Sequence, residues 1–212
     1  MKSIGSVYMA EALEQEKCPI CYLNRKAEHD YIFWFLYEKV NDSGIRSMWR
    51  QSGGFCHKHS WSLHDVASEP HCAGELGVAI LYKDLIENVF LANSTQKRKR
   101  EECFLCAMER DVESRNIDFF IKELEDEDFR EKYSGSHGLC IPHFFMILSI
   151  SDDRGKAFLE GVQKNRMEDL FFRLSEYIRK HDYRFSHEFK ENERNSWKDA
   201  IRLFAGERNE RD

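Results

Sequence analysis

Six of the seven cysteines in this 212-residue chain belong to a pattern that occurs twice. In each copy a Cys-x-x-Cys pair precedes a Cys-x-x-His pair: Cys18 and Cys21 with Cys56 and His59, then Cys103 and Cys106 with Cys140 and His143. The second pair follows after 35 positions in the first copy and 34 in the second. A Cys-x-x-Cys turn can grip one ion, and a Cys-x-x-His at a helix start places thiolate and imidazole one turn apart on the same face. The pattern therefore predicts two metal sites.

Zinc is the metal that this ligand set favours. Three thiolates and one imidazole are a common closed tetrahedral zinc set, and thiolates select zinc or iron–sulfur clusters over hard cations. A cluster is the alternative, whereas rubredoxin-like iron usually takes four sulfurs. We expect two zinc ions, each held within one copy, so that Cys18 and Cys21 share an ion with Cys56 and His59. Exchange of ligands between the copies satisfies the same chemistry.

Other uses of these residues explain the pattern less well. Three disulfides would consume the six cysteines but leave both histidines unexplained, and a Cys-Pro-x-Cys redox dithiol lacks its βαβ context here. His57 could replace His59 as a ligand, but the second copy has Ile141 at that position, so His59 is preferred. The remaining candidates have no counterpart in the other copy and are expected to be surface or packing residues: His64, His71, Cys72 and His137.

The two copies also match outside the ligands. Their offset is 85 at the Cys-x-x-Cys pairs and 84 at the Cys-x-x-His pairs, which one deleted residue explains. With the offset of 84, residues of similar character coincide: Leu36 with Phe120, Val40 with Leu124, Ile45 with Phe129, Arg46 with Arg130 and Trp49 with Tyr133. Apolar positions that recur together with ligands indicate a duplicated structural unit.

The regular structure that the sequence predicts is helical. Residues 22–40 are strongly apolar and free of glycine and proline, 41–43 offer a helix N-cap, and Gly53-Gly54 precedes a helix at about 56–66. In the second copy, apolar residues at helical spacing predict a buried face: Ile117, Phe120, Ile121 and Leu124. Apolar stripes in 76–91 and 167–178 predict one further core helix after each copy.

We therefore expect an all-α fold of two tandem metal-stapled helical repeats, 1–95 and 101–182, with a C-terminal tail or helix, 183–212, all packed as one compact unit. The tail is expected to dock on the body through aromatic residues: Tyr183, Phe185, Phe189 and Trp197. The alternative is a polar recognition site formed by four residues of the same segment: Asp182, Arg184, Glu188 and Trp197.

Charge and hydropathy restrict the partners. The net charge of −6 makes the chain a poor general nucleic-acid binder, and the basic run Lys97–Arg100 is interpreted as a solvated linker rather than a binding patch. No stretch approaches the ~20 apolar residues of a membrane span, and the N-terminus does not resemble a signal peptide. A cytoplasmic protein without membrane contact is expected.

The motifs resemble those of an uncharacterised prokaryotic family, domain of unknown function 6062. The resemblance rests on Cys-Pro-Ile-Cys, Tyr-Glu-Lys-Val-Asn-Asp at 37–42, Gly-Phe-Cys-x-x-His, and His-Gly-Leu-Cys-x-Pro-His at 137–143. The tail run at 181–185, followed by Ser196-Trp197, is similar as well. The resemblance covers nearly the whole chain and implies a prokaryotic protein with paired metal-type motifs, but no established activity.

A closed four-ligand site leaves no open position for a catalytic water, so both metals are expected to be structural. The chain carries no nucleophile–base pair, phosphate loop or glycine-rich cofactor fingerprint that the sequence reveals. The sequence thus favours a non-enzymatic interaction or adaptor module with an unknown protein partner. An iron–sulfur or thiol redox protein is one alternative, and an enzyme that uses a cleft apart from the metals is another.

Overall fold

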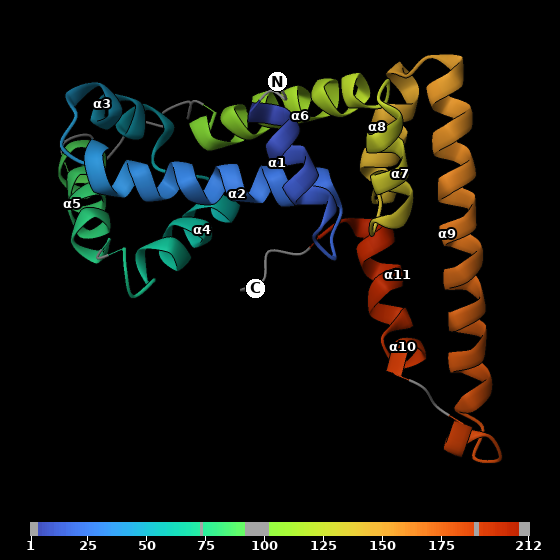
Figure 1. Cartoon of the computed structure of the whole chain (residues 1–212). Helices are drawn as coiled ribbons and strands as arrows, with labels where there is room; N and C mark the ends of the chain where they lie inside the picture. Colours follow the sequence, from blue (N-terminus) through green and yellow to red (C-terminus); the bar gives the residue numbers. More distant parts are fainter. Residues whose placement is uncertain (1–3, 73, 92–101, 189–190, 208–212) are drawn as a thin grey trace. The chain divides into compact units, whose positions relative to one another are not determined.

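The computed structural model describes residues 4–72, 74–91, 102–188 and 191–207. Every regular element in these ranges is helical, as predicted (Figure 1). The α-helices are α1 (Ile4–Leu13), α2 (Pro19–Trp34), α3 (Ser43–Ser52), α4 (His57–Ala67), α5 (Glu75–Leu85), α6 (Phe104–Glu123), α7 (Glu127–Gly135), α8 (Ile141–Ile150), α9 (Asp153–Lys180), α10 (Glu191–Arg194) and α11 (Ser196–Ala205). Short π-helical segments extend α2 over Phe35–Lys39 and α5 over Ile86–Leu91, and a 3-10 turn spans Ser186–Glu188.

The chain forms two compact units. One unit, the central unit, comprises Asn24–Ser114, and the other, the split unit, comprises Met1–Leu23 with Arg115–Glu210. The chain passes from one unit to the other within α2 and again within α6. The boundaries of these compact units differ from the expected repeat ranges 1–95 and 101–182.

A group of aromatic rings packs together in the core of the central unit. Trp49 is fully buried, its ring lies edge-on to Phe55 with the centroids 5.0 Å apart, and its indole Nε1 donates to the carbonyl of Leu81 at 3.0 Å. Helix α3 begins where Asp42 accepts a hydrogen bond from the Ile45 amide, as the predicted N-cap requires. These contacts attach α3 to α5 and complete the core.

The split unit uses matching positions in the same way. Tyr133, which matches Trp49, is also fully buried, with its ring edge-on to Phe120 at 5.2 Å. Asp126 caps α7 as Asp42 caps α3. Arg130 Nε donates to the carbonyl of Leu124 at 2.6 Å, and at the matching positions Arg46 Nε donates to the carbonyl of Val40 at 2.9 Å. Similar sequence positions thus make similar local structure.

Helix α9 differs from the buried helix that its apolar stripe predicted. Leu170 is buried, but Phe171 and Ile178 are each more than 70% exposed. The prediction that this stripe is core was wrong for these residues, because α8 and α11 cover only part of a 28-residue helix (Figure 1). A long helix that packs on its neighbours through one side leaves its other side in solvent, whatever residues lie there.

The C-terminal segment packs on the body, but not through the predicted aromatic residues. Helix α11 packs against α9 and α8. Tyr183 and Trp197 are exposed, and Phe185 stacks under the guanidinium of Arg179, 4.9 Å from the ring centroid. Phe189 lies outside the described residues. Polar residues attach α11 instead: Ser196 is fully buried, and the carboxylate of Asp199 accepts a hydrogen bond from Arg173 of α9 at 2.6 Å.

Candidate metal centres

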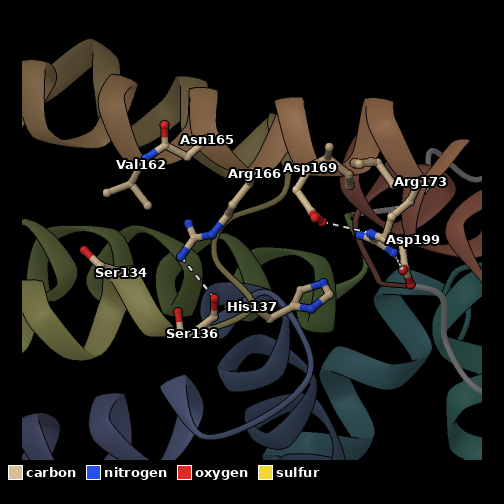
Figure 2. A pocket seen from close by; sticks show the side chains of 11 residues that line it. Ser134, Ser136, His137, Val162, Asn165, Arg166, Asp169, Arg173 and Asp199 are labelled. Atoms are coloured by element: carbon tan, nitrogen blue, oxygen red, sulfur yellow. Dashed lines mark hydrogen bonds and ion pairs between the residues drawn. The ribbon is translucent and has the colours of Figure 1, made fainter. Parts of the chain in front are cut away.

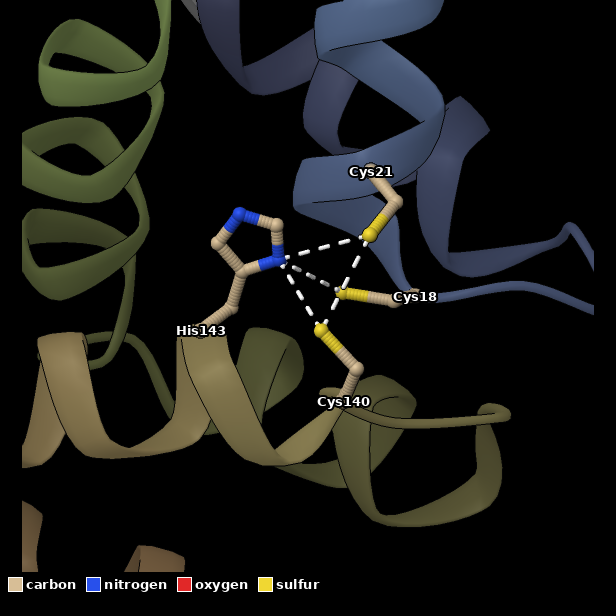
Figure 3. A group of neighbouring side chains, drawn as sticks. All are labelled: Cys18, Cys21, Cys140 and His143. Carbon is tan, nitrogen blue, oxygen red and sulfur yellow. Dashed lines mark hydrogen bonds between the residues drawn. The ribbon is translucent and has the colours of Figure 1, made fainter. Parts of the chain in front are cut away.

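The first centre lies in the split unit and consists of Cys18, Cys21, Cys140 and His143 (Figure 3). The imidazole Nδ1 of His143 faces the three sulfurs, at 3.5 Å from Cys18, 3.4 Å from Cys21 and 3.1 Å from Cys140. The Sγ atoms of Cys21 and Cys140 are 3.8 Å apart. Cys18, Cys140 and His143 are buried. Four ligand atoms thus surround one point from which solvent is largely excluded.

The second centre lies in the central unit and consists of Cys56, His59, Cys103 and Cys106. Nδ1 of His59 lies 3.2 Å from Cys56 and 3.4 Å from each of the other two sulfurs, and the Sγ atoms of Cys56 and Cys106 are 3.7 Å apart. His59 is fully buried. The two centres therefore have the same ligand set and nearly the same dimensions.

The pairing within each copy that the sequence analysis adopted is wrong. Each centre combines the Cys-x-x-Cys of one copy with the Cys-x-x-His of the other, so ligands are exchanged between the copies. All eight predicted residues are brought together in this exchanged arrangement. Both pairings place three sulfurs and one nitrogen around an ion, so ligand chemistry does not distinguish them, and the helix packing selects one.

Helix starts position the ligands. Cys140 is the N-cap of α8 and Cys56 is the N-cap of α4, so the histidine three residues later projects from the first turn on the same side. Two residues before each N-cap lies a glycine with positive φ, 88° at Gly54 and 86° at Gly138. The positive φ favours glycine at Gly138, and a Cβ there would also displace the guanidinium of Arg166.

The ligand spacing fits a single tetrahedral ion. Bond lengths of about 2.3 Å to sulfur and about 2.0–2.1 Å to nitrogen give tetrahedral edges of about 3.8 Å between sulfurs and about 3.6 Å between sulfur and nitrogen. The sulfur–sulfur separations of 3.7 and 3.8 Å match that edge. The sulfur–nitrogen separations of 3.1 to 3.5 Å are slightly shorter. The residues present therefore fit a mononuclear Cys₃His site.

The protonation equilibria of the thiols also favour a bound cation. Contact with the Cys18 thiol holds the pKa of Cys140 at about 4, whereas burial raises the pKa of Cys18 well above its usual range. In the other centre, burial opposes ionisation, but contact with His59 lowers the pKa of Cys103 to about 6, while burial raises that of Cys106 to about 12. In each centre one thiol has a low pKa and a neighbouring thiol has a high pKa, because two adjacent thiolates repel each other. A divalent cation removes that repulsion and allows all three to ionise.

A pair of acidic residues beside His59 was not predicted. The imidazole Nε2 lies 2.9 Å from a carboxylate oxygen of Glu109 and 3.7 Å from one of Glu28. Lys58 forms an ion pair with the same Glu109 carboxylate. Glu109 follows Cys106 by three positions, one helical turn, but the first copy has Asn24 at the matching position. The repeat comparison therefore gave no signal for Glu109.

The other singled-out residues lie away from both centres. His57 and His71 are exposed, and His64 contacts Asp65 at 3.0 Å. Cys72 is buried and packs in the core of the central unit, consistent with a packing role. The basic run Lys97–Arg100 lies outside the described residues.

A cavity of about 430 Å³ in the split unit brings His137 next to α9 and α11 (Figure 2). Its charged side chains form ion pairs: Arg173 donates to the carboxylates of Asp169 at 2.8 Å and Asp199 at 2.6 Å. Arg166 donates to the backbone carbonyls of Tyr133 and Ser136. Burial lowers the pKa of His137, so its imidazole is neutral at pH 7. These contacts hold the loop before Cys140 and attach α11, which makes the cavity a structural junction.

None of the helices in the described part of the chain has the length and apolar character that a membrane crossing requires.

Comparison with known proteins gives a family but no activity. The model of the family of unknown function DUF6062 matches the chain twice, over residues 1–97 and 92–211. The chain is also 24% identical, over 210 residues, to an uncharacterised 23.9 kDa protein encoded in the xynA 3′ region of Caldicellulosiruptor sp. (strain Rt8B.4). That alignment covers 93% of this chain and 99% of the relative. No solved structure matches the chain significantly.

Proposed function

The chain belongs to the DUF6062 family, and from this premise we propose that it is a two-zinc protein whose metals hold an interaction module together. One observation carries the proposal: each compact unit contains a closed set of four ligand atoms, three sulfurs and one imidazole nitrogen, at single-ion spacing. A closed set has no free position for substrate, which is typical of structural rather than catalytic zinc. An internal duplication, in which each copy supplies half of each centre, accounts for the two matches to one family model.

The spacing supports a single ion over an iron–sulfur cluster. A cluster inserts several iron and sulfide ions among its thiolates, which separates the Sγ atoms beyond the edge of a mononuclear site. Here Cys21 and Cys140 are 3.8 Å apart. Among single ions, zinc suits three thiolates and one imidazole and needs no redox partner. Zinc is therefore our proposal for both centres.

A structural role follows from which segments each ion joins. In the split unit, the ion would connect the start of α2 with the start of α8, segments about 120 positions apart. Closing so long a loop costs conformational entropy, which a metal clip offsets in the folded state. Since thiolate ligands must remain reduced, the proposal includes a reducing, cytoplasmic setting.

An exposed apolar face supports the interaction role. On α11 the side chains of Trp197, Ile201 and Phe204 follow helical spacing and are 44%, 57% and 65% exposed. In the same unit an apolar groove of about 560 Å³ lies between α8 and α9, with Phe145 and Phe171 on its walls. Apolar surface of this kind marks protein interaction sites in folded proteins. We propose a protein partner that covers this face.

Metal analysis with cobalt substitution tests the proposal. Protein purified without chelator should contain two zinc ions per chain by elemental analysis. Replacement of zinc by cobalt(II) should give the thiolate charge-transfer and intense ligand-field absorption of tetrahedral sites, with saturation at two equivalents. A brown protein with sulfide in a stoichiometric amount would overturn zinc in favour of a cluster. Fewer than two ions per chain, with half of the ligand thiols freely alkylated, would overturn the two-site model.

A further inference from the structure

His59 lies between two opposite chemical environments. Its Nδ1 faces the three thiols of the central-unit centre, while its Nε2 faces the carboxylate of Glu109 at 2.9 Å. The imidazole is fully buried, and Glu28, whose nearer oxygen is 3.7 Å from Nε2, is only 6% exposed. Burying a carboxylate such as that of Glu28 costs free energy unless a partner compensates its charge. The two acids beside His59 are therefore candidates for a role at this centre.

The coordination chemistry assigns that role. An Nδ1 that binds a metal carries no proton, so the neutral ring keeps its proton on Nε2, the nitrogen that faces Glu109. Glu109 is the acceptor within reach, and Lys58, on the same turn as His59, holds the carboxylate in place. We propose that Glu109 is a positioning residue: it fixes the tautomer and the orientation of His59 and raises the basicity of its Nδ1 toward the metal. The proposal rests on metal binding at this centre.

The two copies differ at the positions that match Glu109 and Glu28. Three residues after the Cys-x-x-Cys pair, the second copy has Glu109 and the first has Asn24. Seven residues after it, the first copy has Glu28 and the second has Glu113. Asn24 Nδ2 donates to Glu113 at 3.4 Å within the central unit. The residue three positions after the Cys-x-x-Cys pair is therefore a carboxylate in the second copy and an amide in the first.

The role of Glu109 should appear in how firmly the ion of the central-unit centre is held. Loss of an outer partner of a ligand histidine typically costs 10–100-fold in metal affinity. Glu109→Gln keeps the shape and one acceptor oxygen but removes the charge. We expect it to accelerate zinc release from one of the two centres by about 10–100-fold and to leave the other unchanged. Asn24→Ala, at the matching position, is the control and should leave release from the central-unit centre at the wild-type rate.

Chelator competition with a chromogenic zinc indicator measures the two release phases in the full-length protein. Alkylation followed by mass spectrometry assigns each phase, because the fast phase in Glu109→Gln should expose Cys103 and Cys106 before Cys18 and Cys21. Equal acceleration of both phases, or none, would overturn the proposal. Absence of bound zinc from wild-type protein would instead refute the proposed function, which keeps the two failures distinct.

Nitrogen-15 NMR of the zinc-loaded wild-type protein gives a readout that does not depend on any variant. The ring of His59 should show a metal-bound Nδ1 and a slowly exchanging Nε2–H, whose proton shift indicates a hydrogen bond to a carboxylate. In Glu109→Gln that proton should move upfield and exchange faster, and Glu109→Asp should restore part of the difference. An Nε2-bound ring, or an Nε2–H signal that Glu109→Gln leaves unmoved, would contradict the positioning role.

Discussion

The Sγ atoms of Cys21 and Cys140 lie 3.8 Å apart, although 119 positions separate the two residues in the chain. In the central unit, His59 Nδ1 lies 3.4 Å from the sulfur of Cys103, a residue of the other copy. Each centre therefore connects the two copies of the motif. Loss of one ligand should disturb ligands in the opposite copy, which gives the first prediction.

Cys140→Ser should release one ion and make Cys18 and Cys21 reactive toward alkylating reagents, while Cys103 and Cys106 stay protected. Cys56→Ser should do the reverse. The reason is that a thiol freed from its metal becomes accessible when the remaining ligands no longer hold the ion. Mass spectrometry of the alkylated peptides identifies the reactive cysteines. If Cys140→Ser exposed Cys103 and Cys106 instead, the copies would be paired internally and the exchanged arrangement would be refuted.

Removal of both ions should strongly destabilise the protein. Structural zinc contributes on the order of 10 kcal/mol in small peptides, which is comparable with the net stability of a whole domain. The apolar cores of both units are larger than that of a zinc finger, so we expect retained helix content with weakened tertiary packing. Calorimetry and near-ultraviolet circular dichroism, with and without chelator, measure the change. Identical melting of the apo and loaded forms would exclude a structural role.

Truncation of two tryptophans should lower the stability of the protein by very different amounts. Trp49 is fully buried, so Trp49→Ala should lower the free energy of unfolding by about 3–5 kcal/mol. Trp197 is 44% exposed, so Trp197→Ala should cost far less, within about 0.5–1 kcal/mol, and should instead weaken partner binding. Chemical denaturation of both variants provides the comparison. A large loss of stability from Trp197→Ala would mean that this face is covered within the folded chain.

Two histidines should titrate on opposite sides of the ordinary value of about 6.5. Burial disfavours the charged form of His29, yet Glu69 at 3.1 Å and Asp30 at 3.3 Å raise its pKa. Burial lowers the pKa of His137. Imidazole carbon–proton NMR of the metal-loaded protein over pH 5 to 8 would resolve both titrations. A pKa of His29 below that of His137, or both pKa values at the ordinary value, would contradict this prediction.

The signs of the stability effects follow from linkage. Since the folded-state pKa of His29 is raised, its contribution is fully present below about pH 6.5 and is lost as pH rises through the folded value. Since that of His137 is depressed, its protonation opposes folding, and stability is lost as pH falls below about 6.5. His29→Gln should therefore flatten the first dependence and His137→Gln the second, measured as melting temperature against pH.

Local chemistry made much of the fold predictable. The caps at Asp42 and the break at Gly53-Gly54 lie where the sequence predicted them, because side-chain acceptors and positive φ act within a few residues. The exposure of Phe171 was not predictable in the same way. Its spacing is that of a core residue, but the side chain lies on an open groove between α8 and α9 and is 73% exposed.

The sequence by itself determined the eight candidate ligand residues and their grouping into pairs, since Cys-x-x-Cys and Cys-x-x-His spacings place two side chains on one helix turn regardless of the rest of the chain. Only the tertiary structure decided which pairs share a centre, because either combination completes a tetrahedral set and the fold of each unit selects between them. The tertiary structure also decided that Glu109 reaches His59, 50 positions away, where the matching residue of the other copy is an amide. Contacts of this kind depend on helix packing, which neither spacing nor residue type specifies.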